Sequence, residues 1–120
     1  MSREIDAKVA ELLGLNPFWE ELRKDWCYYS DLTSVPLRIP HYSSTGDGML
    51  LLLEKIKSKL SWNVILVSHL RAFNFDEGFT VNVFDCYRVL LTSHEEKESA
   101  PRAVSLAVLK AKGVDITPYI

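Results

Sequence analysis

The chain has 120 residues, of which 16 are acidic and 14 basic, so its formal charge is −2, and 48% of its residues are apolar. This is the composition of an ordinary globular protein, which excludes a disordered chain, a collagen-like repeat and a disulfide scaffold. We therefore expect one domain over residues 1–120, and we expect no nucleic acid as partner, because binding to phosphate backbones needs a clustered basic face.

The N-terminal segment has the pattern of a short amphipathic helix. Gly14 offers a natural C-terminal stop, and the Asn16-Pro17 pair breaks the chain after it. The apolar residues that recur at helical spacing are Ile5, Val9, Leu12 and Leu13.

Residues 18–41 are less regular and rich in large aromatic side chains. Phe18, Trp19 and Leu22 predict one or two helical turns. Residues 37–39 lie between two prolines, which predicts a loop or a short edge strand. The aromatic side chains of this stretch either plug one end of the core or form a wall that binds a partner.

A second helix is predicted over residues 49–60, behind a capping segment. Residues 43–47 are a cluster of helix-capping residue types, and an apolar stripe follows them. The stripe consists of Met49, Leu52, Leu53, Ile56 and Leu60.

A run of strands follows the second helix. Residues 62–70 are apolar on both faces, which predicts a central strand covered on each side. Residues 73–78 predict a turn, residues 79–83 alternate as a second strand, and residues 87–92 supply a third. Because these strands are close in sequence, we expect an antiparallel meander.

The C-terminal part is predicted to be an acidic loop over residues 93–99 followed by a third helix. Ser99 is placed to cap this helix, Pro101 falls in its first turn, and Gly113 ends it. Its Ala- and Val-rich face permits close packing on a sheet. The complete pattern predicts an α+β fold, a layered helix/sheet/helix sandwich with a short antiparallel sheet and three main helices.

Three segments in order carry a family resemblance: Arg3-Glu4-Ile5-Asp6-Ala7-Lys8-Val9-Ala10-Glu11, then Ile39-Pro40-His41-Tyr42-Ser43-Ser44-Thr45, then Ser99-Ala100-Pro101-Arg102-Ala103-Val104 continuing through Ala107-Val108-Leu109-Lys110-Ala111-Lys112-Gly113. The chain resembles the phage ABA-sandwich domain family, small proteins of phages and prophages of Gram-positive bacteria. Two departures are an extra Ser between Tyr42 and Thr45 and Gly46 before Asp47. The resemblance implies a helix–sheet–helix sandwich and a viral origin, but no activity by itself.

The start of the second helix is one candidate ligand site. Ser43, Ser44 and Thr45 precede backbone N–H groups at the positive end of the helix dipole, an arrangement that holds phosphate or carboxylate groups. Tyr42 beside them is suited to stacking on a base. The competing interpretation is plain helix capping by Thr45 or Asp47.

Arginine and amide side chains at the predicted sheet form a second candidate site. Arg71 and Arg88 flank the predicted strands, and Asn82 lies on the polar face of one of them. An arginine beside aromatic rings grips a phosphate and stacks on a base. The competing interpretation is that both arginines are solvated strand ends.

Several site classes have no support in the sequence. The residue types that bind metals lack ligand-like spacing, so we expect no metal and no cofactor: Cys27, His41, His69 and Cys86. No nucleophile elbow, Walker or Rossmann pattern occurs, so we expect a protein that is not an enzyme.

The N-terminus lacks a secretory pattern, and no apolar run is long enough to span a bilayer. We therefore expect reduced thiols, no membrane partner and a place in the host cytoplasm.

Three functions are compatible with these patterns to different degrees. The first is a phage sponge, a homo-oligomer that binds a nucleotide-derived immune signal of the host, of cyclic nucleotide or ADP-ribose type, through Tyr42, Ser43, Ser44, Thr45, Arg71, Asn82 and Arg88. The second is an interaction protein that binds a host or phage protein through residues 18–29, where exposed aromatics are typical of an interface. The third, a nuclease or phosphodiesterase-like enzyme, is weakened by the missing metal and acid–base pattern.

Overall fold

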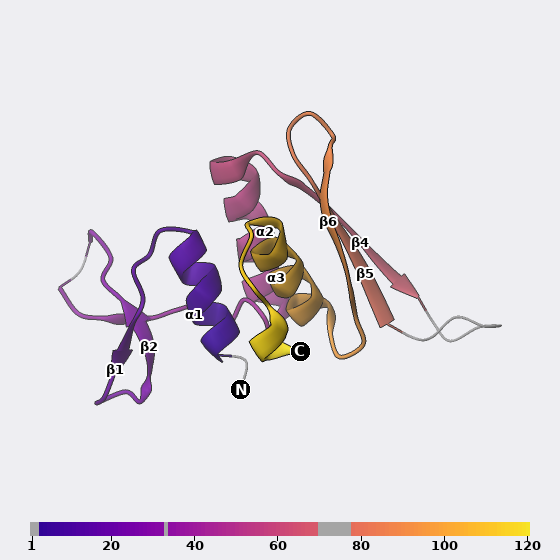
Figure 1. The fold of residues 1–120 in the computed structure, drawn as a ribbon. Coiled ribbons are helices and arrows are strands. Elements are labelled where there is room, and N and C mark those ends of the chain that lie inside the picture. Colours follow the sequence, from indigo (N-terminus) through magenta and orange to yellow (C-terminus); the bar gives the residue numbers. More distant parts are fainter. Residues whose placement is uncertain (1–2, 33, 70–77) are drawn as a thin grey trace.

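The structure is a computed structural model that describes residues 3–32, 34–69 and 78–120 (Figure 1). These residues form three α-helices and two small antiparallel sheets of three strands each, so the α+β prediction is confirmed. Most of the predicted turn over residues 73–78 and the candidate residue Arg71 lie outside the described residues.

The first sheet follows helix α1 (Arg3–Leu12), which ends before Gly14 as predicted. Its strands β1 (Phe18–Glu20), β2 (Asp25–Tyr28) and β3 (Leu37–Arg38) pair in the order β1-β2-β3. The predicted helical turns at residues 18–22 are wrong. Trp19 instead lies opposite Trp26 across the β1–β2 pair, with their rings edge to face at 6.1 Å, and such cross-strand aromatic pairs stabilise a hairpin.

Helices α2 (Gly46–Leu60) and α3 (Ala100–Ala111) begin at the predicted caps. Thr45 accepts a hydrogen bond from the Gly48 N–H at 2.9 Å, and Ser99 accepts one from the Arg102 N–H at 3.3 Å. A short 3₁₀ turn (Thr117–Tyr119) closes the chain. The helices of the described ranges have at most 15 residues, and none is a candidate to cross a bilayer.

The second sheet consists of β4 (Asn63–His69), β5 (Gly78–Phe84) and β6 (Leu90–Glu96) in the order β4-β5-β6, which confirms the antiparallel meander. The prediction of a central strand over residues 62–70 is wrong, because β5 is central and β4 lies at an edge. The acidic loop predicted from Ser93 onward is also wrong in its first half. Strand β6 continues to Glu96, because its residue His94 pairs with Val81 of β5 and is buried on the inner face.

Helix α3 is the centre of the core. Its residues from Ala103 to Leu109 are all buried, against α1 and α2 on one side and β5 and β6 on the other. A helix that is buried all round needs small or apolar residues on every face, which the Ala- and Val-rich sequence of α3 supplies. The expected helix/sheet/helix order of layers is not confirmed, since Figure 1 shows the helices lying between the two sheets.

Candidate functional site

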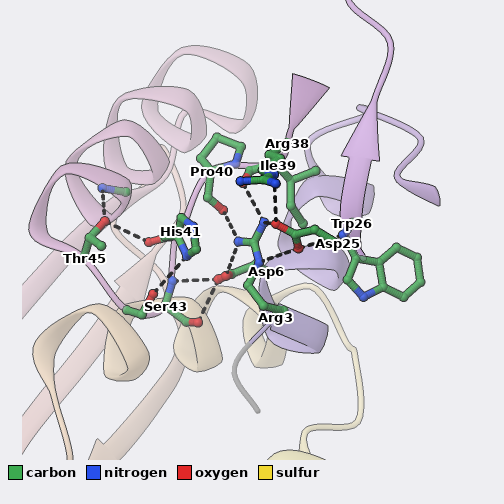
Figure 2. Close-up of polar contacts among 12 residues, drawn as sticks. Arg3, Asp6, Asp25, Trp26, Arg38, Ile39, Pro40, His41, Ser43 and Thr45 are labelled. Atoms are coloured by element: carbon green, nitrogen blue, oxygen red, sulfur yellow. Dashed lines mark hydrogen bonds and ion pairs between the residues drawn. The ribbon is translucent and has the colours of Figure 1, made fainter. Parts of the chain in front are cut away.

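Residues 41–45, here called the hydroxyl loop, are held by the buried carboxylate of Asp6 in α1 (Figure 2). Asp6 accepts hydrogen bonds from the Ser43 backbone N–H at 2.8 Å and from the Ser43 hydroxyl at 2.7 Å. Arg3 lies 2.7 Å from the other carboxylate oxygen. Since a buried carboxylate is stable only with such partners, this contact is a structural anchor of the loop.

Arg3 extends the anchor to the first sheet. Its guanidinium contacts Asp25 of β2 at 3.0 Å and donates to the carbonyls of Ile39 and Pro40 at 2.9 and 3.2 Å (Figure 2). Burial opposes ionisation of Asp25, but the hydrogen bonds from Arg3 and from the Trp26 N–H outweigh it and lower the pKa of this carboxyl. One arginine thus joins α1, β2 and the segment that leads into α2.

The four candidate residues of the hydroxyl loop have different surroundings. Tyr42 is buried, and burial raises the pKa of its phenol to about 12. Ser43 is buried on Asp6, whereas Thr45 caps α2, so the capping interpretation is confirmed for Thr45. Only Ser44 and Thr45 are exposed. A ligand at this helix start therefore meets two hydroxyls, one of them already used by the helix.

A cavity of about 320 Å³ lies at the second sheet, lined by Asn63, Ile65, Phe84 and Arg88. The strand register explains this grouping, because Asn63 lies opposite Phe84 and Ile65 lies opposite Asn82. Paired residues of an antiparallel sheet share a face, and these residues occupy the face opposite the buried Val81 and Val83. The cavity volume falls within the range of small-molecule sites.

Arg88, which lines this cavity, belongs to residues 85–89, here called the arginine turn. The Asp85 carboxylate accepts from the backbone N–H groups of Tyr87 at 2.8 Å and Val89 at 3.0 Å. Arg88 has a left-handed backbone with φ of 64°, and the register of β5 with β6 shifts beside the turn, between Val83 and Phe84. Left-handed backbone strains a residue with a Cβ, and irregularities of this kind gather at functional sites.

The Arg88 guanidinium has no hydrogen bond or ion pair with any described residue, and its side chain is exposed. The cavity thus combines an aromatic ring, an aliphatic side chain, an amide and an uncompensated cation. An aromatic ring is suited to a base or another flat group, and a guanidinium to a phosphate. Its described lining offers no carboxylate, histidine or cysteine.

The structure separates the predicted site residues into two groups. Asn82 and Arg88 belong to the outer face of the second sheet and its turn, whereas the hydroxyl loop packs on α1. Phe84, Asn63 and Ile65 were missed as site residues. Phe84 continues the outward alternation of Thr80 and Asn82, so this alternation was the signal that could have found it.

A polar cluster between β6 and α3 is structural in character. Arg102 of α3 contacts Glu96 and Glu98 at 3.3 Å each and donates to the Tyr119 carbonyl, which ties the C-terminal turn to the sheet. Burial lowers the pKa of His94, partly opposed by the charge of Glu96.

Within the described ranges, no group of three or more metal-ligating side chains occurs. Cys27 is buried and Cys86 is exposed.

The aromatic segment of the first sheet is partly exposed. Trp19 and Tyr29 are 47% and 59% exposed, whereas Trp26 and Tyr28 pack against the core. Tyr29 stacks on Phe18 with 5.1 Å between ring centroids. Two of these four aromatic side chains, Trp19 and Tyr29, are therefore exposed, one on each face of the sheet.

Comparison with known proteins gives a likeness of fold. The chain resembles the 2.0 Å crystal structure of a phage protein from Bacillus cereus ATCC 14579, with 20% sequence identity and a TM-score of 0.67. The likeness covers 96% of this chain and 90% of that one. No family model and no curated protein matches the sequence.

Proposed function

We propose that this protein is a phage-encoded, non-catalytic binder of a nucleotide-derived small molecule and acts as a sponge for a host immune signal of cyclic nucleotide or ADP-ribose type. The observation that carries the proposal is the uncompensated guanidinium of Arg88 beside Phe84, at a cavity of about 320 Å³. Phosphate and base are the two chemical groups that such a pair recognises together.

The phage origin, the ABA-sandwich family and action in the host cytoplasm are parts of this proposal. They are supported by the three sequence segments described above and by the fold likeness to the Bacillus cereus phage protein. A sponge needs donors and stacking surfaces but no catalytic base, in keeping with a described cavity lining that has no carboxylate, histidine or cysteine. Homo-oligomerisation is the remaining part, because small binders of this kind enlarge their pockets between subunits.

Calorimetry with two probes, ADP-ribose and cyclic di-AMP, tests the binding site. We expect the wild-type protein to bind one of them, and Arg88→Ala to weaken this binding about tenfold or more, the usual effect of losing a charge-assisted hydrogen bond. Arg23→Ala is the matched control, because it removes the same charge from the turn region between β1 and β2. Equal weakening by both variants would indicate a general charge effect and contradict the site.

The fate of the probe tests the absence of catalysis. The bound nucleotide, released by heating, should be chemically unchanged, and a cleaved product would overturn the non-catalytic part of the proposal. Native mass spectrometry of protein from cells with and without an active nucleotide-signalling defence extends the test to the natural ligand. An added nucleotide-sized mass only in the signalling cells is the expected result.

A second function keeps a specific observation in its favour. Trp19 and Tyr29 are exposed on opposite faces of the first sheet, and Leu22 and Leu32 in the loops beside it are 92% and 96% exposed. Large apolar side chains exposed to this degree are found at protein interfaces. Under this alternative, Trp19→Ser would abolish capture of a host or phage protein, whereas Arg88→Ala would leave capture unchanged.

A further inference from the structure

Strand β4 forms an open edge of the second sheet. It pairs with β5 on one side, and no other described strand pairs with its second side. Its sequence, Asn63-Val64-Ile65-Leu66-Val67-Ser68-His69, contains no Asp, Glu, Lys, Arg or Pro. Natural proteins usually protect an edge of this length with charges, proline or a bulge, because unpaired N–H and C=O groups recruit another strand.

The apolar side chains of β4 are exposed on both faces. Ile65 and Val67 on the outer face are 51% and 47% exposed, and Leu66 on the inner face is 37% exposed. On the inner side, a cavity of about 250 Å³ remains between α2 and β4, lined among others by Leu53, Trp62 and Val64. A strand that is apolar on both faces is typical of a sheet interior, and β4 becomes interior only if a further strand joins its edge.

The opposite edge of the same sheet is built differently. Strand β6 carries Glu95 and Glu96 near its end, and its pairing with β5 contains a register irregularity. Charges and irregularities of this kind prevent edge-to-edge association. The contrast indicates that β6 is protected against a partner strand, whereas β4 is not.

We propose that two copies of this chain pair antiparallel through β4, about a two-fold axis at Leu66, and form one continuous sheet with three strands from each copy. Because β4 is uncharged, this pairing brings no like charges together along the edge. It is also closed, since the same strand serves on both sides of the axis. Pairing of β4 with the β6 edge of another copy would leave free edges at both ends and would bring Glu95 and Glu96 into the interface.

This arrangement specifies which residues meet. With the axis at Leu66, Ile65 lies opposite Val67 of the partner subunit on the outer face, and the reverse pair lies symmetrically beside it. Val67 of the partner subunit then lies beside the cavity that Ile65 and Asn63 line. The inference sharpens the oligomer part of the proposed function, and its test contains no nucleotide, so ligand binding and strand pairing fail or succeed separately.

Sedimentation velocity of the full chain at increasing concentration is the test. We expect a reversible dimer with a dissociation constant on the order of micromolar, because a contact built on one strand pair is at the small end of protein interfaces. Ile65→Lys places two lysines at diagonal positions across the axis, about 7–8 Å apart along the strands, and Val67→Glu does the same with two glutamates. Both positions are half exposed in the single chain, so both variants are expected to fold and to be monomeric.

Mixing the two variants gives the sharpest outcome. In a mixed pair, the lysine introduced by Ile65→Lys in one copy faces the glutamate introduced by Val67→Glu in the other, so a heterodimer should form where each variant alone stays monomeric. Leu22→Lys, at an exposed position on the first sheet, is the control and should leave the wild-type dimer intact. A wild-type protein that is monomeric up to about 100 μM, far above that expected constant, would overturn the proposal. So would a dimer that both variants leave intact, or a mixture that stays monomeric.

Discussion

The hydroxyl loop and the arginine turn are both short polar segments organised by an aspartate, yet they end in opposite states. In the hydroxyl loop, Asp6 takes up the amide and hydroxyl of Ser43, and Thr45 caps α2, so its polar groups are used by the fold. In the arginine turn, Asp85 takes up only backbone N–H groups and leaves the Arg88 guanidinium without a described partner. Of the two candidate sites, the hydroxyl loop therefore has most of its polar groups engaged by the fold, whereas the arginine turn leaves a cation available at a cavity.

The largest effect is expected from Asp6→Asn, which tests whether the hydroxyl loop is structural. The amide cannot accept from Ser43 and Arg3 as the carboxylate does, and it leaves Arg3 partly uncompensated. Breaking one partner of such a buried pair costs about 3 kcal/mol or more of the free energy of unfolding. Urea denaturation measures this loss. Glu4→Gln, on an exposed position of the same helix, should change stability by less than about 0.5 kcal/mol; similar losses in both variants would refute the anchoring role.

An intermediate effect is expected from Gly48→Ala, which tests the close packing of the loop on α2. A Cβ at Gly48 would lie 2.0 Å from the His41 carbonyl oxygen, so the backbone must move. We expect a loss of about 1–3 kcal/mol, as for other overpacked sites. Gly46→Ala is the matched control two residues earlier, where a Cβ meets nothing within 4 Å. Thermal unfolding that ranks Gly46→Ala as the more damaging change would contradict this account.

The smallest effect, and one of opposite sign, is expected from Arg88→Gly in the arginine turn. Glycine adopts the left-handed backbone without strain, but it loses more chain entropy on folding than arginine does. The net gain in the free energy of unfolding should therefore be about 0.5–1 kcal/mol. The same variant should lose nucleotide binding. Lys24→Gly, at another left-handed position with φ of 49°, should gain similar stability and keep binding. If Arg88 had only a structural role, Arg88→Gly would keep nucleotide binding, as Lys24→Gly does.

The sequence predicted the helices and their caps well because those features are local. Thr45 and Ser99 accept hydrogen bonds from residues three positions further along the chain, and such short-range chemistry is readable from neighbouring residues. The meander of the second sheet was predictable for the same reason, since its strands follow one another directly. The β1 strand was mistaken for helical turns because the pairing of Trp19 with Trp26, not local propensity, determines it.

The candidate site was only half predictable. Arg88 and Asn82 were recognised from residue type and strand phase, but Phe84, Ile65 and Asn63 become neighbours through the β4–β5 register. The burial of Ser43 was not predictable because its partner, Asp6, lies 37 positions away in the chain. Without that contact, the sequence offers no means of telling a solvent-facing serine from a buried one.

Periodicity and capping act over a few residues, so the sequence alone was enough to predict an α+β chain with three helices, the caps of two of them and an antiparallel meander. The sequence did not reveal that α3 lies between two sheets, that β4 is an edge, or that Ser43 is buried while Arg88 is exposed. These outcomes depend on contacts between residues far apart in the chain, such as Arg3 with Asp25 and Asp6 with Ser43. Side chains that are equivalent in the local sequence pattern therefore differ in burial because of long-range packing. This difference in burial distinguishes the anchor of the fold from its candidate binding site.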